Sequence, residues 1–204
     1  MQAIITGDMI GSTHIDPNIW LPILKKALSK WGKENRNWEV FRGDSFQINI
    51  EAEDVLKFVY ILKATLKAEN LDARMAIGLG PIKYIADNIA ESNGEAFIYS
   101  GRLLDHLKPK KLRISSDYPE NDLIFNTAFD LATLVMDDWK PVTAKIIQTV
   151  WEHPEMNQTE IAKLLDKTQS NISEGLKRAG YEELMQLENL YTLKIKALLN
   201  ESTS

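Results

Sequence analysis

The spacing of apolar residues along this chain follows two periods, and each period predicts one kind of element. Short apolar runs and alternating stretches, bounded by turn residues, are typical of β-strands and occur at residues 2–7, 38–41, 46–50, 74–79 and 112–115. Longer segments in which apolar residues recur every three or four positions are typical of helices and occur at residues 17–31, 55–66, 95–107, 121–138, 142–152, 157–165, 169–179 and 181–200. Residues 83–93 fit neither pattern, so we expect a loop there, and we expect the tail 201–204 to be disordered.

The order of the first elements indicates the fold. Up to residue 79 they run strand, helix, strand, strand, helix, strand, which is the ferredoxin-like split βαβ arrangement, with helices on one face of its sheet. Trp139-Lys140-Pro141 is a natural boundary before a purely helical segment. We therefore predict an α/β (α+β) fold with a ferredoxin-like domain over 1–116, a linking helix over 117–139 and an all-α domain over 140–204.

The predicted linking helix is apolar on two sides. One stripe consists of Ile124, Ala128, Leu131 and Val135, and a second consists of Phe125, Phe129, Ala132 and Met136. A helix with two apolar sides has to be covered on both of them. The cover is either another part of the chain or a second copy, and together with the apolar stripe over 184–198 this helix predicts a homodimer.

Composition narrows the possible chemistry. The chain has no cysteine, which excludes disulfides, thiolate metal sites and cysteine nucleophiles. It has neither an apolar run of the roughly 20 residues that a membrane span needs nor a secretory signal pattern, so we expect a cytoplasmic protein without a membrane partner. A net charge of −5 disfavours non-specific adhesion to nucleic acid but is compatible with a small local DNA-binding face.

Two Gly-Asp pairs stand at the ends of predicted strands. Gly7-Asp8 follows the first strand, and Gly43-Asp44 lies in the turn between the second and third strands. If those strands are neighbours, Asp8 and Asp44 meet at one sheet edge and form a possible site for Mg²⁺ or Mn²⁺, which prefer oxygen ligands. The alternative is that both pairs are only turn residues, because Asp and Gly are favoured in tight turns.

Residues 159–179 have the pattern of a DNA-binding helix-turn-helix. Ile161, Leu165, Ile172 and Leu176 would form a shared core, and the small Ala162 would let the two helices pack closely. Short polar side chains at the front of the second helix could reach base edges: Gln169, Ser170, Asn171 and Ser173. Three basic residues stand where phosphates would pass: Lys167, Lys177 and Arg178. Asp166 replaces the glycine common in such turns, and an ordinary three-helix module without DNA remains the alternative.

The motifs Gly7-Asp8-Met9-Ile10-Gly11-Ser12, Arg42-Gly43-Asp44, Arg74…Gly78-Leu79-Gly80 and Gly94…Arg102 resemble, in this order, the catalytic domain of class III nucleotidyl cyclases and, more loosely, the GGDEF and polymerase palm group. The resemblance covers residues 1–116. It implies that Asp8 and Asp44 bind metal, and that Arg102 stabilises the transition state if the protein is an enzyme. It also implies that five residues contact a nucleotide: Gly7, Gly11, Ser12, Gly43 and Arg102.

Two positions depart from the cyclase pattern. Ile98 stands at the asparagine position, and Val40 stands at the position of the lysine that helps to read the base. These departures favour binding over catalysis. Over most of its length the chain resembles the SatD family of bacterial proteins, on Gly43-Asp44-Ser45-Phe46-Gln47, Gly94-Glu95-Ala96-Phe97 and the C-terminal helix-turn-helix.

These observations leave two main interpretations of function. The first is a bacterial DNA-binding regulator whose cyclase-like N-terminal domain binds a nucleotide, a divalent metal or both. The second is an active class III-like nucleotidyl cyclase or nucleotidyltransferase that uses two metal-binding aspartates, with the terminal helices serving only dimerisation. A degenerate scaffold that does neither is a third possibility.

Overall fold

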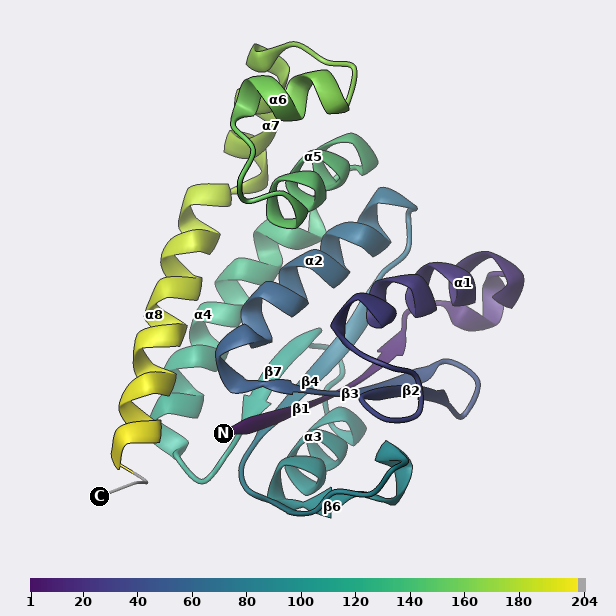
Figure 1. Ribbon diagram of the computed structural model, residues 1–204, viewed down its shortest axis with the longest axis vertical. Helices are drawn as coiled ribbons and strands as arrows, with labels where there is room; N and C mark the ends of the chain where they lie inside the picture. Colours follow the sequence, from purple (N-terminus) through teal and green to yellow (C-terminus); the bar gives the residue numbers. More distant parts are fainter. Residues whose placement is uncertain (202–204) are drawn as a thin grey trace.

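The computed structural model describes residues 1–201 and has the mixed α/β class that the sequence predicts (Figure 1). Its main sheet has the strand order β2-β3-β1-β4-β7. The strands are β1 (Gln2–Met9), β2 (Trp38–Phe41), β3 (Ser45–Glu51), β4 (Ala73–Leu79) and β7 (Leu112–Ser115). β1 pairs antiparallel with both β3 and β4, β2 pairs antiparallel with β3, and β7 lies parallel to β4.

The helices agree with the predicted segments to within a few residues at each end. They are α1 (Pro17–Leu28), α2 (Val55–Ala68), α3 (Glu95–Asp105), α4 (Pro119–Asp137), α5 (Pro141–Glu152), α6 (Gln158–Leu164), α7 (Gln169–Ala179) and α8 (Tyr181–Glu201). Glu201 closes α8, and the rest of the predicted disordered tail, residues 202–204, lies outside the described residues. None of the helices over residues 1–201 combines the length and apolar character that crossing a bilayer requires.

Two local expectations were wrong. The segment expected to be a loop contains two short paired strands, β5 (Ile82–Tyr84) and β6 (Asn93–Gly94), with a 3₁₀ turn at Ile89–Glu91 between them. The sheet is also not covered on one face only. α1 and α2 pack on one face and α3 packs on the other, against β4 and β1 (Figure 1).

Most of the apolar side chains form one continuous core. It fills the space between the sheet and α1 and α2, and it continues into α4, α5 and α8. A second, smaller core belongs to the α5–α7 unit, defined here as residues 141–179, and consists of Ile146, Ile161, Ala162, Ile172 and Leu176. The terminal helices are therefore seated on the sheet layer through shared packing, with α6 and α7 projecting from it (Figure 1).

Only one of the two predicted apolar sides of α4 is covered within the chain. The side carrying Phe125, Phe129, Ala132 and Met136 is buried in the main core. The other side is open, and its large apolar residues are exposed: Leu123, Ile124, Leu131, Leu134 and Val135. We call this second side the outer stripe of α4.

The approach of α3 to the sheet depends on Gly78 in β4. A Cβ atom at this position would lie 2.0 Å from the carbonyl oxygen of Ala96 and 2.7 Å from the backbone nitrogen of Ser100, both on α3. Because backbone atoms would have to move, α3 can occupy its place only if residue 78 has no side chain.

We therefore expect Gly78→Ala to lower the free energy of unfolding by about 1–3 kcal/mol, the usual cost of overpacking. Gly101 on the same helix is the control, because a Cβ there meets nothing within 4 Å. Gly101→Ala should leave stability unchanged or raise it by up to about 1 kcal/mol, since alanine is the better helix former. Urea unfolding of both variants measures the difference, and equal effects would show that α3 does not depend on Gly78.

Candidate functional site

The face of the sheet that carries α3 is polar near its centre. Alternation along β1 places Ile5 and Met9 in the main core and turns Thr6 and Asp8 to the opposite face. On the neighbouring strands Gln47 lies across from Thr6, and Asp8 lies between Ser45 of β3 and Arg74 of β4. Ile4 and Ala76 on the same face are buried and apolar, so the polar stretch is confined to the part of the face around Thr6 and Asp8.

These side chains line a cavity of about 470 Å³, which we call the sheet-face cavity. The strands and the turn between β2 and β3 contribute one wall, and the end of α3 contributes the other. The lining residues are Thr6, Asp8, Phe41, Arg42, Ser45, Gln47, Arg74, Gly101, Leu104, Asp105 and Lys108. The volume lies within the range typical of pockets for small molecules.

A chain of hydrogen bonds fixes the floor of this cavity. Gln47 Nε2 donates to Thr6 Oγ1 at 3.1 Å, and the Thr6 hydroxyl donates to Ser100 Oγ at 2.9 Å. Ser100 Oγ in turn donates to the carbonyl of Phe97 at 3.2 Å. Thr6 and Ser100 are both buried, so these bonds tie β1 to α3 and hold the polar floor in one arrangement.

The predicted metal ligands have separate partners. Arg74 donates from Nε to Asp8 Oδ1 at 2.8 Å and from Nη2 to Asp8 Oδ2, so both carboxylate oxygens are engaged. Asp44 accepts a hydrogen bond from Ser12 Oγ, and its side chain is not part of the cavity lining. Over residues 1–201 no group of three or more His, Asp or Glu side chains could hold a metal ion. Neither predicted metal ligand is therefore free of a partner: Asp8 is engaged by Arg74 and Asp44 by Ser12.

The fold itself requires glycine at the three glycine positions that were predicted to contact a nucleotide. A side chain on Gly7 would meet the ring of Phe46 at 2.4 Å and the Arg74 carbonyl oxygen at 2.6 Å. Gly11 and Gly43 have φ values of 74° and 87° and allow the turns after β1 and before β3. Arg102 is exposed on α3 and is not among the residues that line the cavity.

Two capping boxes define the α5–α7 unit. Asn157 Oδ1 accepts hydrogen bonds from the backbone of Thr159 at 2.9 Å and of Glu160 at 3.1 Å, which starts α6. Thr168 Oγ1 accepts from the Asn171 backbone at 3.2 Å and starts α7. Asp166, in the turn between them, has a left-handed φ of 51°, which Asp tolerates better than most residues.

Close packing completes this unit and leaves the front of α7 open. A Cβ at Gly175 would lie 2.6 Å from Ile146 Cδ1, so α7 lies directly against α5. Gln169 Nε2 donates to Gln158 Oε1 at 2.7 Å, which orients the Gln169 side chain. All seven predicted DNA-contacting residues are exposed on one continuous segment: Lys167, Gln169, Ser170, Asn171, Ser173, Lys177 and Arg178.

Sequence reasoning missed most of the sheet-face cavity. Ser45, Gln47 and Thr6 were readable in principle, because a polar residue at every second position within buried strands predicts a polar sheet face. Arg74 was noted only as part of a motif, and its pairing with Asp8 follows from a strand register that the sequence does not state. Lys108 has no local signal, since it follows α3 in an irregular segment.

No family model, curated protein or solved structure matches the chain.

Proposed function

We propose that this chain is a DNA-binding regulator in which the α5–α7 unit is a helix-turn-helix and α7 is its recognition helix. The observation that carries the proposal is the exposed polar front of α7 on a compact three-helix unit with its own core. Gln169, Ser170 and Ser173 would face base edges in a major groove, and Lys167 and Lys177 would meet phosphates. The protein is acidic overall, so the local basic residues of this unit would direct DNA to it.

Residues 1–116 would form the domain that senses the ligand. The order β2-β3-β1-β4, with α1 and α2 together on one face, supports a ferredoxin-like arrangement extended by β7. The helices α4, α5 and α8 share one core with the sheet. Binding of a nucleotide-type ligand on the sheet would therefore be coupled to the α5–α7 unit through continuous side-chain packing.

We further propose that a second copy of this chain covers the outer stripe of α4. Asp130, beside Leu131 on α4, has its charge paired by Arg113 and Lys110, and Leu131 and Leu134 are 65% and 70% exposed. The C-terminal end of the stripe reaches the junction of α7 and α8, because Val135 Cγ1 lies 2.9 Å from where a Cβ of Gly180 would be. A two-fold pairing of α4 helices would place the α5–α7 units of two copies beside each other. That arrangement suits binding to a two-fold symmetric operator.

Leu131→Asp should therefore weaken self-association at least about tenfold, since a buried unpaired carboxylate costs more than 1.4 kcal/mol. The control is Leu164→Asp, which places the same charge on an exposed leucine of α6, outside the stripe. Sedimentation velocity between 1 and 100 μM, a range chosen around typical dimer affinities, compares the two variants with the parent. A parent that is monomeric throughout, or equal behaviour of both variants, would rule out this interface.

Selection from a random duplex library with the full chain tests the main proposal. We expect enrichment of an inverted repeat whose half-sites lie about 10 base pairs apart centre to centre. Absence of any enriched sequence, with no duplex binding at about 50 mM salt, would overturn it.

Incubation with Mg²⁺ or Mn²⁺ and each of the four triphosphates serves as a parallel test. Turnover that is abolished by Asp44→Ala would instead support the cyclase or nucleotidyltransferase interpretation.

A further inference from the structure

The sheet-face cavity carries an excess of positive charge in a protein whose net charge is −5. Arg42, Arg74 and Lys108 line it against Asp8 and Asp105. Arg74 is occupied by Asp8, but Arg42 and Lys108 have no ion-pair partner within residues 1–201. Two unpaired cations at the mouth of a polar cavity favour an anionic ligand.

Arg74 engages both oxygens of Asp8, one of the two aspartates predicted to bind metal. Both oxygens of Asp8 accept hydrogen bonds from its guanidinium group, so a cation could reach Asp8 only by displacing an ion pair that is mostly shielded from solvent. The guanidinium already neutralises the carboxylate at the cavity floor. An anion approaching from the mouth therefore meets a floor without excess negative charge, and no divalent cation is needed to screen it.

The remaining walls indicate what else the ligand carries. Ser45 and Gln47 offer hydrogen-bonding groups beside the basic residues, and Leu104 adds apolar surface on the α3 side. The half-buried ring of Phe41 forms part of the wall, with the Arg42 guanidinium 6.0 Å from its centre. A flat ring in the ligand could stack on this aromatic face while its charged group meets Arg42 and Lys108.

We propose that the sheet-face cavity binds a small phosphorylated molecule with a planar ring, and binds it without a divalent metal ion. The proposal rests on the proposed function in that this cavity would be the sensing site. It differs from the two-metal arrangement that the cyclase resemblance implies, because the charge that stabilises the phosphate comes from the Arg42, Lys108 and Arg74 side chains.

Isothermal titration of the full chain with ATP, pyrophosphate and inorganic phosphate, each in EDTA and again with excess Mg²⁺, tests the proposal. We expect ATP to bind in EDTA with an affinity that Mg²⁺ leaves unchanged or weakens, and to bind more tightly than pyrophosphate because of its ring. The double variant Arg42→Gln, Lys108→Gln should weaken ATP binding at least tenfold. The matched control Arg36→Gln, Lys33→Gln removes the same two charge types from exposed positions outside the cavity and should bind as the parent does.

Several outcomes would overturn this inference. Binding that requires Mg²⁺, or that Asp44→Asn abolishes, would restore the metal-dependent site. Absence of binding by all three phosphates, or equal binding by both double variants, would show that the cavity is not the site. Duplex selection is independent of these titrations, so a chain that selects DNA but binds no phosphate fails only the present proposal. A chain that binds phosphate but no DNA fails only the proposed function.

Discussion

Replacing Gln169 and Ser173 with alanine is expected to weaken binding to the selected duplex by about 10- to 100-fold. Each side chain is exposed on the front of α7, and a good contact to a base edge contributes about 1–3 kcal/mol of discrimination. Gln169 is also held in one orientation by Gln158, so less of its binding energy is lost in ordering the side chain. Binding to unrelated duplexes should change little, because phosphate contacts carry that affinity.

Two controls make this result specific. Gln186→Ala changes an exposed glutamine on α8, outside the α5–α7 unit, and should leave affinity for both duplexes unchanged. Lys177→Gln should weaken binding to all duplexes alike and reduce the slope of log affinity against log salt by about one unit. Fluorescence anisotropy over a salt series measures each variant. If the double alanine variant keeps the parent's preference for the selected sequence, α7 is not the reading helix.

The elements of this chain were predictable because their signals are local. The motif Asp16-Pro17 marks the start of α1, and the structure has Asp16 Oδ1 accepting from the Asn18 backbone at 2.9 Å. The bounds of α7 were predicted to the residue, since Thr168 and Gly180 are strong capping residues at its two ends. The apolar spacing of the outer stripe of α4 could be recognised in the sequence, but the spacing did not show that this side of the helix is exposed.

The partners of the charged side chains were less predictable, because they depend on register and on which face a helix covers. The sequence places Asp8 and Asp44 at the ends of neighbouring strands, which is correct for β1 and β3. However, Asp8 lies opposite Ser45 rather than Asp44, and a shift of one residue changes the face to which a side chain points. Asp8 reaches Arg74 through the separate register of β1 with β4, and Asp44, in the turn before β3, accepts a hydrogen bond from Ser12.

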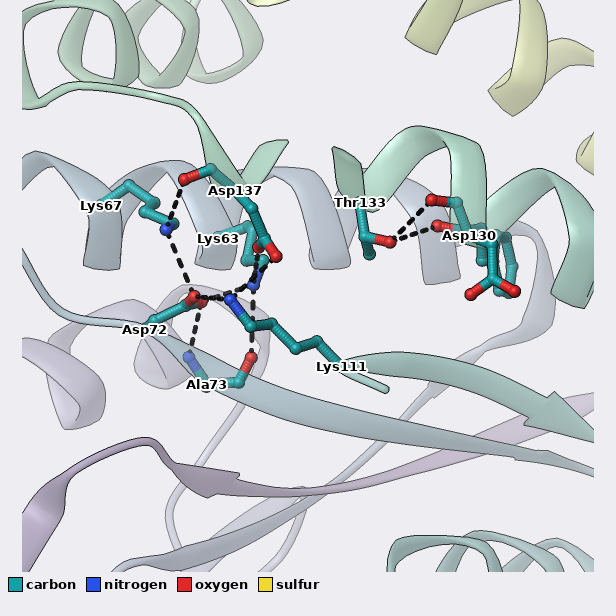
Figure 2. A network of polar contacts seen from close by, with 9 residues as sticks. Lys63, Lys67, Asp72, Ala73, Lys111, Asp130, Thr133 and Asp137 are labelled. Atoms are coloured by element: carbon teal, nitrogen blue, oxygen red, sulfur yellow. Dashed lines mark hydrogen bonds and ion pairs between the residues drawn. The ribbon is translucent and has the colours of Figure 1, made fainter. Parts of the chain in front are cut away.

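A partly buried cluster of charges was missed because it too depends on how distant elements pack together. Lys63 and Lys67 of α2, Asp72 before β4, Lys111 before β7 and Asp137 at the end of α4 come together from distant parts of the chain (Figure 2). Asp72 is central, since it contacts the Nζ atoms of all three lysines and also accepts from the Ala73 backbone at 2.9 Å. The cluster fastens α4 to the layer of α2 and the sheet.

Asp72→Ala is expected to lower the free energy of unfolding by about 3 kcal/mol. Lys63 is only 1% exposed, and without Asp72 its ammonium group keeps a single carboxylate partner, Asp137, at 3.3 Å. Removing one member of a buried ion pair is costly because the other charge remains buried. Asp138→Ala is the control, because this neighbouring aspartate is exposed, and it should change stability by less than about 0.5 kcal/mol. Urea unfolding at pH 7 compares the two, and a loss below 1 kcal/mol for Asp72→Ala would show that the remaining charges compensate.

The same cluster predicts how stability depends on pH. Burial alone would raise the pKa of Asp72, but Lys63, Lys67 and Lys111 together lower it below its ordinary value. A carboxyl group whose pKa is lower in the folded chain contributes stability above its unfolded pKa of about 4, and this contribution is lost as the pH falls through the folded pKa. The stability difference between the parent and Asp72→Asn should therefore be largest at neutral pH and shrink below about pH 4. Urea unfolding of both proteins between pH 7 and pH 2.5 measures it, and a constant difference over that range would mean that the charge of Asp72 is not what holds α4 in place.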